Sequence, residues 1–139
     1  MPVDWEHPSD AKQGQDFIAL LAVVRDQLPS GQYKLTTALP CAEWALCHID
    51  IRKADEYLDL MNVKAYDFTT AARAGYHAQL YPAQPGEGSG ASGVTYLMNN
   101  GFPASKILLG VPCYGHSFLG ATAAGHPSHG NGGDDGTFE

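Results

Sequence analysis

Basic residues are scarce in this sequence, and they never form a run. Lys and Arg together number 8 against 15 Asp and Glu, so the formal net charge at pH 7 is −7. Proteins that bind the phosphates of nucleic acids or the headgroups of anionic membranes use basic patches. The composition therefore argues against nucleic acid and against a membrane surface as partners, and a neutral ligand fits better.

Long apolar runs and cysteine pairs are also lacking. No stretch approaches the ~20 consecutive apolar residues of a transmembrane helix, and residues 1–4 do not resemble a signal peptide. Three cysteines, Cys41, Cys47 and Cys113, leave at least one thiol unpaired, which excludes a small fold held by disulfides. The remaining composition, 44% apolar over 139 residues, suits a single domain with a core.

The apolar spacing predicts strands that alternate with helices. Alternation of this kind is typical of parallel strands joined by right-handed crossovers, which is an α/β fold. A long connection over 69–91 has the length of a binding loop or lid, and the tail over 120–136 has the composition of a loop. The predicted elements are a short strand that ends at 4–6, a helix over 10–28, a strand over 33–39, a loop over 41–48, a helix over 49–57, a strand over 58–66, a helix capped by Ser92 that ends before Gly101, and a strand over 106–112.

The first helix has the clearest signal. Ser9 and Asp10 offer a side chain that can cap its first turn. Apolar residues then recur at the spacing of one helix face, so we expect that face to be buried. The residues concerned are Phe17, Leu20, Leu21, Val24 and Leu28.

Two carboxylates, Asp4 and Glu6, stand two positions apart at the end of the first predicted strand. Side chains alternate across a strand, so both acids should share one face. A pair of neighbouring acids can keep one group protonated as a proton donor while the other stays ionised. The plainer alternative is a pair of solvated acids at a strand end.

Polar and aromatic residues also follow the other predicted strands. In parallel α/β folds, ligands bind at the carboxyl ends of the strands. We therefore expect one rim to collect Asp4, Glu6, Glu43, Trp44, Tyr66, Asp67, Tyr114 and His116. For Trp44, a packed aromatic and a platform that stacks on a sugar are equally good interpretations.

Four segments, taken in order, resemble the chitinases of glycoside hydrolase family 18. Residues 3–6, Val-Asp-Trp-Glu, resemble the last part of the family signature Asp-x-x-Asp-x-Asp-x-Glu, with Pro2 at the middle aspartate. Residues 64–67 resemble Met-x-Tyr-Asp, with Lys64 in place of methionine. Residues 75–81 resemble the loop that follows, and 106–118 resemble the seventh strand, with His116 where arginine is usual.

The resemblance implies a partial (β/α)₈ TIM barrel that comprises about strands four to seven. Residues 1–118 would be this part of the catalytic domain, and 119–139 the start of an insertion that follows strand seven. A barrel closes only with all its strands, so we expect a fragment with two open sheet edges.

The resemblance also implies hydrolysis of β-1,4-linked N-acetylglucosamine polymers by a retaining, substrate-assisted mechanism. Glu6 would protonate the glycosidic oxygen, Asp4 would hold the acetamido group, and Tyr66 would donate a hydrogen bond to it. No metal or other cofactor is needed, and we expect a monomer whose parent enzyme is secreted. Sugar binding would fall to Asp67, Trp44, Tyr114 and His116.

Several alternatives stay open. One is a catalytically inactive relative that binds chito-oligosaccharides as a lectin does, and another is a truncated product that does not fold alone. A dinucleotide site at the Gly-x-Gly-x-x-Gly of residues 88–93 is disfavoured because no strand leads into it. Metal binding is disfavoured because neither the pair His126 and His129 nor the other Cys and His residues have the spacing of a zinc site. The residues in that second group are Cys41, Cys47, His48, Cys113 and His116.

Overall fold

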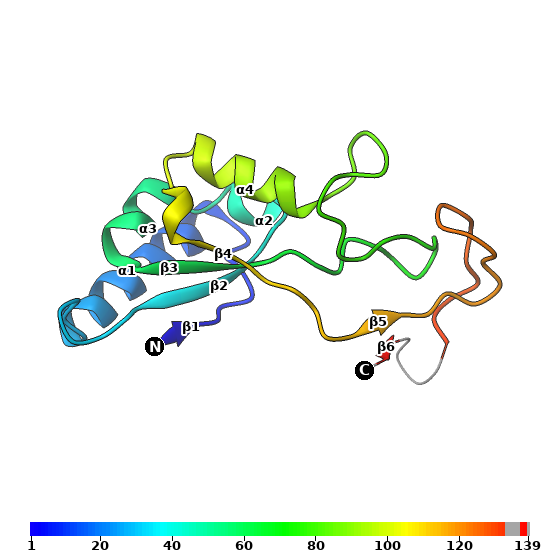
Figure 1. Ribbon diagram of the computed structural model, residues 1–139. Helices are drawn as coiled ribbons and strands as arrows, with labels where there is room; N and C mark the ends of the chain where they lie inside the picture. The colour runs from blue at the N-terminus through cyan, green and yellow to red at the C-terminus, as the bar shows by residue number, and fades with distance from the viewer. Residues whose placement is uncertain (133–136, 139) are drawn as a thin grey trace.

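The chain, described here by a computed structural model over residues 1–132 and 137–138, is built on a four-stranded parallel sheet. The strands lie side by side in chain order, β1-β2-β3-β4. Right-handed crossovers that always step in the same direction place their helices on one side of a sheet. Figure 1 shows this arrangement, with the helices gathered on one side. The strands are β1 (Pro2–Val3), β2 (Thr36–Pro40), β3 (Leu60–Lys64) and β4 (Ile107–Leu109).

Helices connect these strands. Together with the sheet they form what we call the α/β unit, the compact part of the molecule in Figure 1. The predicted alternation of strands and helices is confirmed. The helices are α1 (Ala11–Gln27), α2 (Glu43–Leu46), α3 (Ile51–Tyr57), α4 (Gly90–Asn99) and the 3₁₀ turn η1 (Ala104–Lys106).

Helix α1 begins where the sequence predicts. The Asp10 side chain accepts a hydrogen bond of 2.8 Å from the backbone N–H of Gln13, which caps the first turn. Phe17 and Leu21 are fully buried, but Leu20 is 40% exposed. The predicted buried face was therefore too wide, because the helix packs along a narrower line than its apolar spacing suggests.

Two other expectations were wrong in detail. The predicted loop over 41–48 contains helix α2. The cap of α4 is Ser89 and not Ser92, because the Ser89 hydroxyl accepts from the Ser92 N–H at 3.1 Å. Ser92 occupies the third helical position, where its hydroxyl accepts in return from the Ser89 N–H at 3.0 Å.

The two faces of the sheet differ in burial. Along β2 and β3, alternate residues are buried, including Leu39 and Val63, and these side chains belong to the core beneath the helices. The residues between them are only partly covered, and Lys64 is one of these. The side chains that β2 and β3 direct away from the helices are therefore available to a site.

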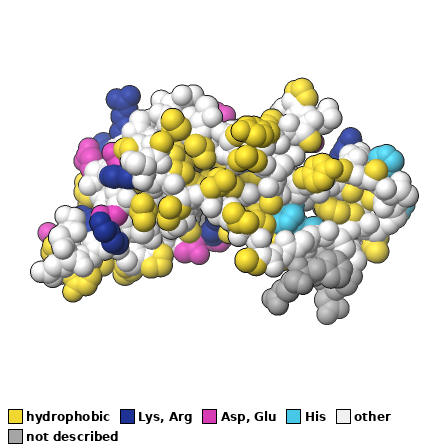
Figure 2. Space-filling view, in the orientation of Figure 1, with side chains coloured by type: hydrophobic (Ala, Val, Ile, Leu, Met, Phe, Trp, Pro, Cys, Tyr) yellow, Lys and Arg dark blue, Asp and Glu magenta, His cyan; other side chains and the backbone are white. Residues whose placement is uncertain are grey.

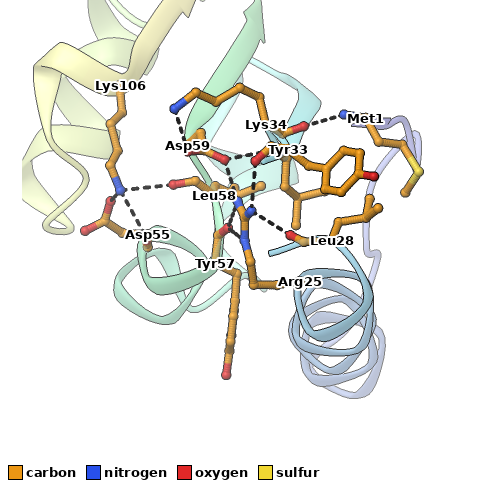
Figure 3. Close-up of polar contacts among 11 residues, drawn as sticks. Met1, Arg25, Leu28, Tyr33, Lys34, Asp55, Tyr57, Leu58, Asp59 and Lys106 are labelled. Carbon is orange, nitrogen blue, oxygen red and sulfur yellow. Dashed lines mark hydrogen bonds and ion pairs between the residues drawn. The ribbon is translucent and has the colours of Figure 1, made fainter. Parts of the chain in front are cut away.

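At the amino end of the strands lies a network of polar contacts around Asp59 (Figure 3). Its carboxylate is 16% exposed and lies 2.5 Å from Arg25 Nη2 and 3.1 Å from Lys34 Nζ. It also accepts the Leu35 N–H at 2.8 Å. Burial alone would raise the pKa of Asp59, but these hydrogen bonds outweigh burial and hold the pKa well below its usual range.

Beyond the carboxyl ends of the strands, the chain forms a second region that we call the extension, residues 65–89 and 110–132 with the strand β6 (Thr137–Phe138). Its described residues form no α-helix, and β5 (Gly115–His116) pairs antiparallel with β6. The long connection predicted over 69–91 is thus confirmed up to Ser89. The predicted loop over 120–136 and the predicted insertion over 119–139 fall partly on 133–136 and 139, which lie outside the described residues.

The visible face of the molecule differs along its length. In Figure 2 most charged side chains gather over the α/β unit, apolar side chains occupy the middle, and histidines lie toward the extension. No helix in the described ranges has both the length and the apolar character needed to cross a bilayer. The three cysteines are all free, as expected for at least one of them.

Candidate active site

Two acids just beyond the end of β1 meet a lysine from β3. Lys64 Nζ lies 2.9 Å from Asp4 Oδ1 and 2.6 Å from Glu6 Oε1. Both acids therefore lie at the face of the sheet that the helices leave uncovered. The strand predicted to end at 4–6 ends at Val3, so the alternation of a strand is not what brings the two acids together. The Asp4 side chain is 58% exposed and that of Glu6 is 80% exposed, whereas that of Lys64 is 20% exposed.

Lys64 is held by its neighbours as a cation. Burial alone would lower the pKa of this ammonium group, but the hydrogen bonds and charges of Glu6 and Asp4 outweigh burial, so its pKa is raised. A charged donor thus occupies the inner side of both carboxylates. A ligand atom that contacts either carboxylate must approach from the exposed side or displace Lys64.

The residue after Glu6 is under backbone strain. His7 has a φ of 140°, which is rare for a residue with a side chain. Its ring stands edge-on to Trp44, with the centroids 4.9 Å apart. Trp44 lies in α2 and is 66% exposed, so the packed interpretation of this aromatic is wrong and an open apolar face remains for a ligand.

A second group of polar side chains surrounds Asp67, just beyond the carboxyl end of β3. The Tyr114 hydroxyl donates to both of its oxygens, at 2.7 and 2.8 Å. His116 Nε2 lies 2.8 Å from Asp67 Oδ1. The sequence predicted all three residues at the rim, and the structure brings them into direct contact although 47 to 49 positions separate Asp67 from the others.

The electrostatics of this group favour an ionised Asp67. Burial alone would raise its pKa, but hydrogen bonds from His116 and Tyr114 outweigh burial and lower it. The pKa of Tyr114 is raised by burial and by the adjacent carboxylate, so the phenol stays protonated and donates. Asp67 itself has a φ of 61°, a left-handed conformation that Asp tolerates better than most residues.

One residue of this group was missed by the sequence reasoning. His77, in the extension, has its Nδ1 3.5 Å from Asp67 Oδ1 and its Nε2 3.2 Å from the Tyr114 carbonyl oxygen. Asp67, His77 and His116 each offer one potential metal-ligating atom, and these atoms lie within 4.8 Å of one another. The spacing of His77 in the sequence gives no signal for this contact, because a loop without regular structure positions it.

A single open cleft of about 1100 Å³ connects most of these residues. Glu6, Trp44, Tyr66 and Asp67 line it together with Lys64. Among the described residues that line the cleft, Asp4, Tyr114 and His116 do not appear. They reach it indirectly: Asp4 contacts Lys64, His116 contacts Asp67, and Tyr114 packs its ring edge-on to Tyr66 with centroids 6.0 Å apart.

Comparison with known proteins relates this site to a family. The sequence model of the family described as Glycosyl hydrolases family 18 matches residues 2–139. Endochitinase 1 of Metarhizium robertsii is 33% identical over 99% of this chain, and chitinase 1 of Aphanocladium album is 33% identical over 94%. The crystal structure of the Group IV chitinase of Ostrinia furnacalis in complex with allosamidin superposes on 94% of the chain with a TM-score of 0.86 and 27% identity.

These matches cover almost all of this chain but only part of each relative. The chain spans about a third of the curated relatives, 35% and 34% of their lengths, and 40% of the Ostrinia structure. The four-stranded parallel sheet thus matches part of the TIM-barrel catalytic domains of these proteins.

Proposed function

This chain belongs to glycoside hydrolase family 18, and from that membership we propose that its cleft takes part in the hydrolysis of β-1,4-linked N-acetylglucosamine polymers. The observation that carries the proposal is the meeting of Glu6, Tyr66 and Asp67 on one open cleft at the carboxyl ends of parallel strands. A cleft in this position is the usual ligand site of barrel enzymes.

The proposed reaction is retaining and substrate-assisted. Glu6 protonates the glycosidic oxygen and later activates water, and its 80% exposed side chain is open to an incoming sugar. Asp4 orients the acetamido group whose carbonyl oxygen attacks the anomeric carbon, and Tyr66 donates a hydrogen bond to that group. Asp67 contacts the sugar, Trp44 stacks on it, and Tyr114 and His116 support Asp67.

The architecture of the parent protein belongs to the proposal as well. We assign β1 to β4 to strands four to seven of a (β/α)₈ barrel, residues 1–118 to its catalytic domain, and 119–139 to the insertion after strand seven. Four parallel strands in chain order with helices on one side are an arc of such a barrel. We further propose a monomeric, secreted parent enzyme that acts on chitin or chito-oligosaccharides.

The proposal is tested by turnover of a fluorogenic chitobiose substrate. Glu6→Gln keeps the size of the side chain but removes the titrating group, and we expect it to lower kcat/KM by a factor of about 10² to 10⁴. The matched control is Glu43→Gln, because Glu43 lines the same cleft and has no role in the proposed chemistry. Full activity in Glu6→Gln, or an equal loss in both variants, would overturn the assignment.

A second function, binding of oligosaccharide without cleavage, is favoured by one observation. The Lys64 ammonium group already donates to both acids, and it competes with substrate for the lone pairs of Glu6 and Asp4. A bound sugar could occupy the cleft between Trp44 and Asp67 while the acids stay paired with Lys64.

Lys64→Met separates the two functions, because it removes the ammonium group and keeps an unbranched side chain of similar length. For a hydrolase limited by Lys64, we expect turnover to rise while the affinity for a chito-oligosaccharide stays the same. For a binding protein, calorimetry would show oligosaccharide binding, and turnover would be absent both in the unsubstituted chain and in Lys64→Met.

A further inference from the structure

The group around Asp67 contains an arrangement that sugar binding does not require. Three side chains from separate segments converge: Asp67 after β3, His77 in the extension and His116 in β5. Their potential ligand atoms, one carboxylate oxygen and two imidazole nitrogens, all lie within 4.8 Å of one another. Sequence spacing argued against a metal site because it considered histidines and cysteines in the pattern of known zinc sites and left out His77 and the carboxylate of Asp67.

The hydrogen bonding of His77 fixes its tautomer. Its Nε2 lies 3.2 Å from the Tyr114 carbonyl oxygen, and because a carbonyl can only accept, Nε2 must carry the hydrogen. In the neutral ring, Nδ1 then carries a lone pair. Metal-binding histidines commonly have this form, with the second nitrogen held by a backbone carbonyl.

That lone pair has an unusual environment. Nδ1 of His77 is buried and has no hydrogen-bond partner among the described residues. Asp67 Oδ1 lies 3.5 Å from Nδ1, so in the neutral ring a lone pair faces a carboxylate oxygen. Buried polar atoms without a partner are costly, and a cation between the two atoms would satisfy both.

The other groups complete a coordination set. His116 Nε2 lies 2.8 Å from the same Oδ1, and it can ligate once its proton moves to Nδ1. Tyr114 donates to both oxygens of Asp67 and orients the carboxylate as an outer-sphere partner does. In a tetrahedral zinc site with bonds of about 2.0–2.1 Å, ligand atoms lie ~3.3 Å apart, so the observed 3.5 Å fits and the 2.8 Å contact must open slightly.

We propose that Asp67, His77 and His116 bind a divalent transition-metal ion, with zinc as its reference occupant. Two imidazoles and one carboxylate suit zinc and its neighbours better than they suit magnesium or calcium, which prefer oxygen ligands. Three protein ligands leave one coordination position open toward solvent or a sugar hydroxyl. This proposal does not depend on hydrolysis, since it is tested by binding of the metal alone.

The test uses the full 139-residue chain and Zn²⁺, with Co²⁺ as a spectroscopic probe. We expect one equivalent of Zn²⁺ by calorimetry, and the intense visible absorption of four-coordinate Co²⁺. In NMR spectra, the ring signals of His77 and His116 should shift on addition of Zn²⁺ while those of His129 should not. Absence of stoichiometric binding, or ring shifts at other histidines only, would overturn the proposal.

Variants provide the second measurement. His77→Gln and His116→Gln should each weaken Zn²⁺ binding by more than 100-fold, and Tyr114→Phe by about 10-fold, as outer-sphere changes usually do. His129→Gln is the matched control because this exposed histidine lies in the extension outside the cluster. Far-UV circular dichroism verifies that each variant is folded, and unchanged binding in a folded His77→Gln would also overturn the site.

Discussion

Asp59 at the amino end of the sheet is largely buried and paired, whereas the acids at the carboxyl end are largely exposed. At the amino end, Asp59 is 16% exposed and its oxygens are bound by Arg25, Lys34 and the Leu35 amide. At the carboxyl end, the side chains of Asp4, Glu6 and Asp67 are 53–80% exposed. Only this second end carries strained backbone at non-glycine residues and buried nitrogens without partners, among the residues described.

The difference shows how one framework can serve stability and chemistry separately. A fully paired charge is unavailable to a ligand, and removal of its partner destabilises the fold. Strain and incomplete pairing cost stability but leave groups ready to bind something else. The amino end should therefore dominate the free energy of unfolding, and the carboxyl end should dominate ligand binding.

The strongest test of this difference is Asp59→Ala, for which we expect the largest loss in the free energy of unfolding. It leaves the Arg25 guanidinium, 15% exposed, without its counter-charge. Removal of one partner from a buried pair costs about 3 kcal/mol of the free energy of unfolding. Urea denaturation followed by circular dichroism measures the loss.

The matched control for Asp59→Ala is Asp67→Asn at the other end. Its carboxylate is 53% exposed, so we expect a loss of about 1 kcal/mol or less. If Asp67→Asn were as destabilising as Asp59→Ala, the division between the two ends would be wrong.

A second test concerns packing below the carboxyl end. A Cβ added at Gly14 in α1 would lie 1.8 Å from the backbone oxygen of His48, so the helix must move. We expect Gly14→Ala to cost about 2 kcal/mol, although alanine usually favours helices. Gly31→Ala is the control because its Cβ would meet nothing within 4 Å. Equal thermal midpoints for both variants would show that the close contact is absent in solution.

The acid limb of the stability curve tests the amino end again. The pKa of Asp59 is lower in the folded chain than its unfolded value of ~3.9, so its contribution is complete above about pH 5 and is lost as pH falls. Between pH 6 and pH 3 the unsubstituted chain should therefore lose about 1 kcal/mol more of its unfolding free energy than Asp59→Ala. Identical losses in urea titrations at the two pH values would contradict this assignment.

The smallest effect concerns the cap of α4, a helix that borders the cleft. Ser89→Ala removes the hydroxyl that accepts the Ser92 N–H, and should cost about 1 kcal/mol. Ser92→Ala should cost less than half of that, since the Ser92 hydroxyl bonds the N–H and the carbonyl oxygen of Ser89 and pairs no N–H of the first turn. A larger loss in Ser92→Ala than in Ser89→Ala would show that Ser92 is the cap, as the sequence predicts.

The sequence predicted those parts of the fold that depend on neighbouring residues. Periodicity located α1 and the strands, and the cap at Asp10 followed from residue type alone. The exposure of Leu20 and the position of Ser89 were not predictable in this way. Both depend on where the helix meets the rest of the molecule, which a local pattern does not encode.

The candidate site shows the same division. The order of strand ends predicted Asp4, Glu6 and Asp67 at one rim, and in the structure Glu6 and Asp67 line one cleft while Asp4 reaches it through Lys64. The two-residue spacing predicted acids on one strand face, but the strand ends at Val3 and the acids share Lys64 instead. The contact of Lys64 with both acids was missed, because Lys64 is 60 positions from Asp4 and 58 from Glu6 in the sequence. His77 was missed because irregular backbone carries it to Asp67, and no periodicity records such a path.

The left-handed backbone at Asp67 has a consequence for how this site can change over evolutionary time. With φ at 61°, the position readily accepts only aspartate, asparagine or glycine. Of these three, aspartate alone carries a charge. A single nucleotide change to asparagine or glycine codons can thus silence the site while the fold persists. Glutamate, a longer acid, would keep the charge but is disfavoured by the left-handed backbone at this position.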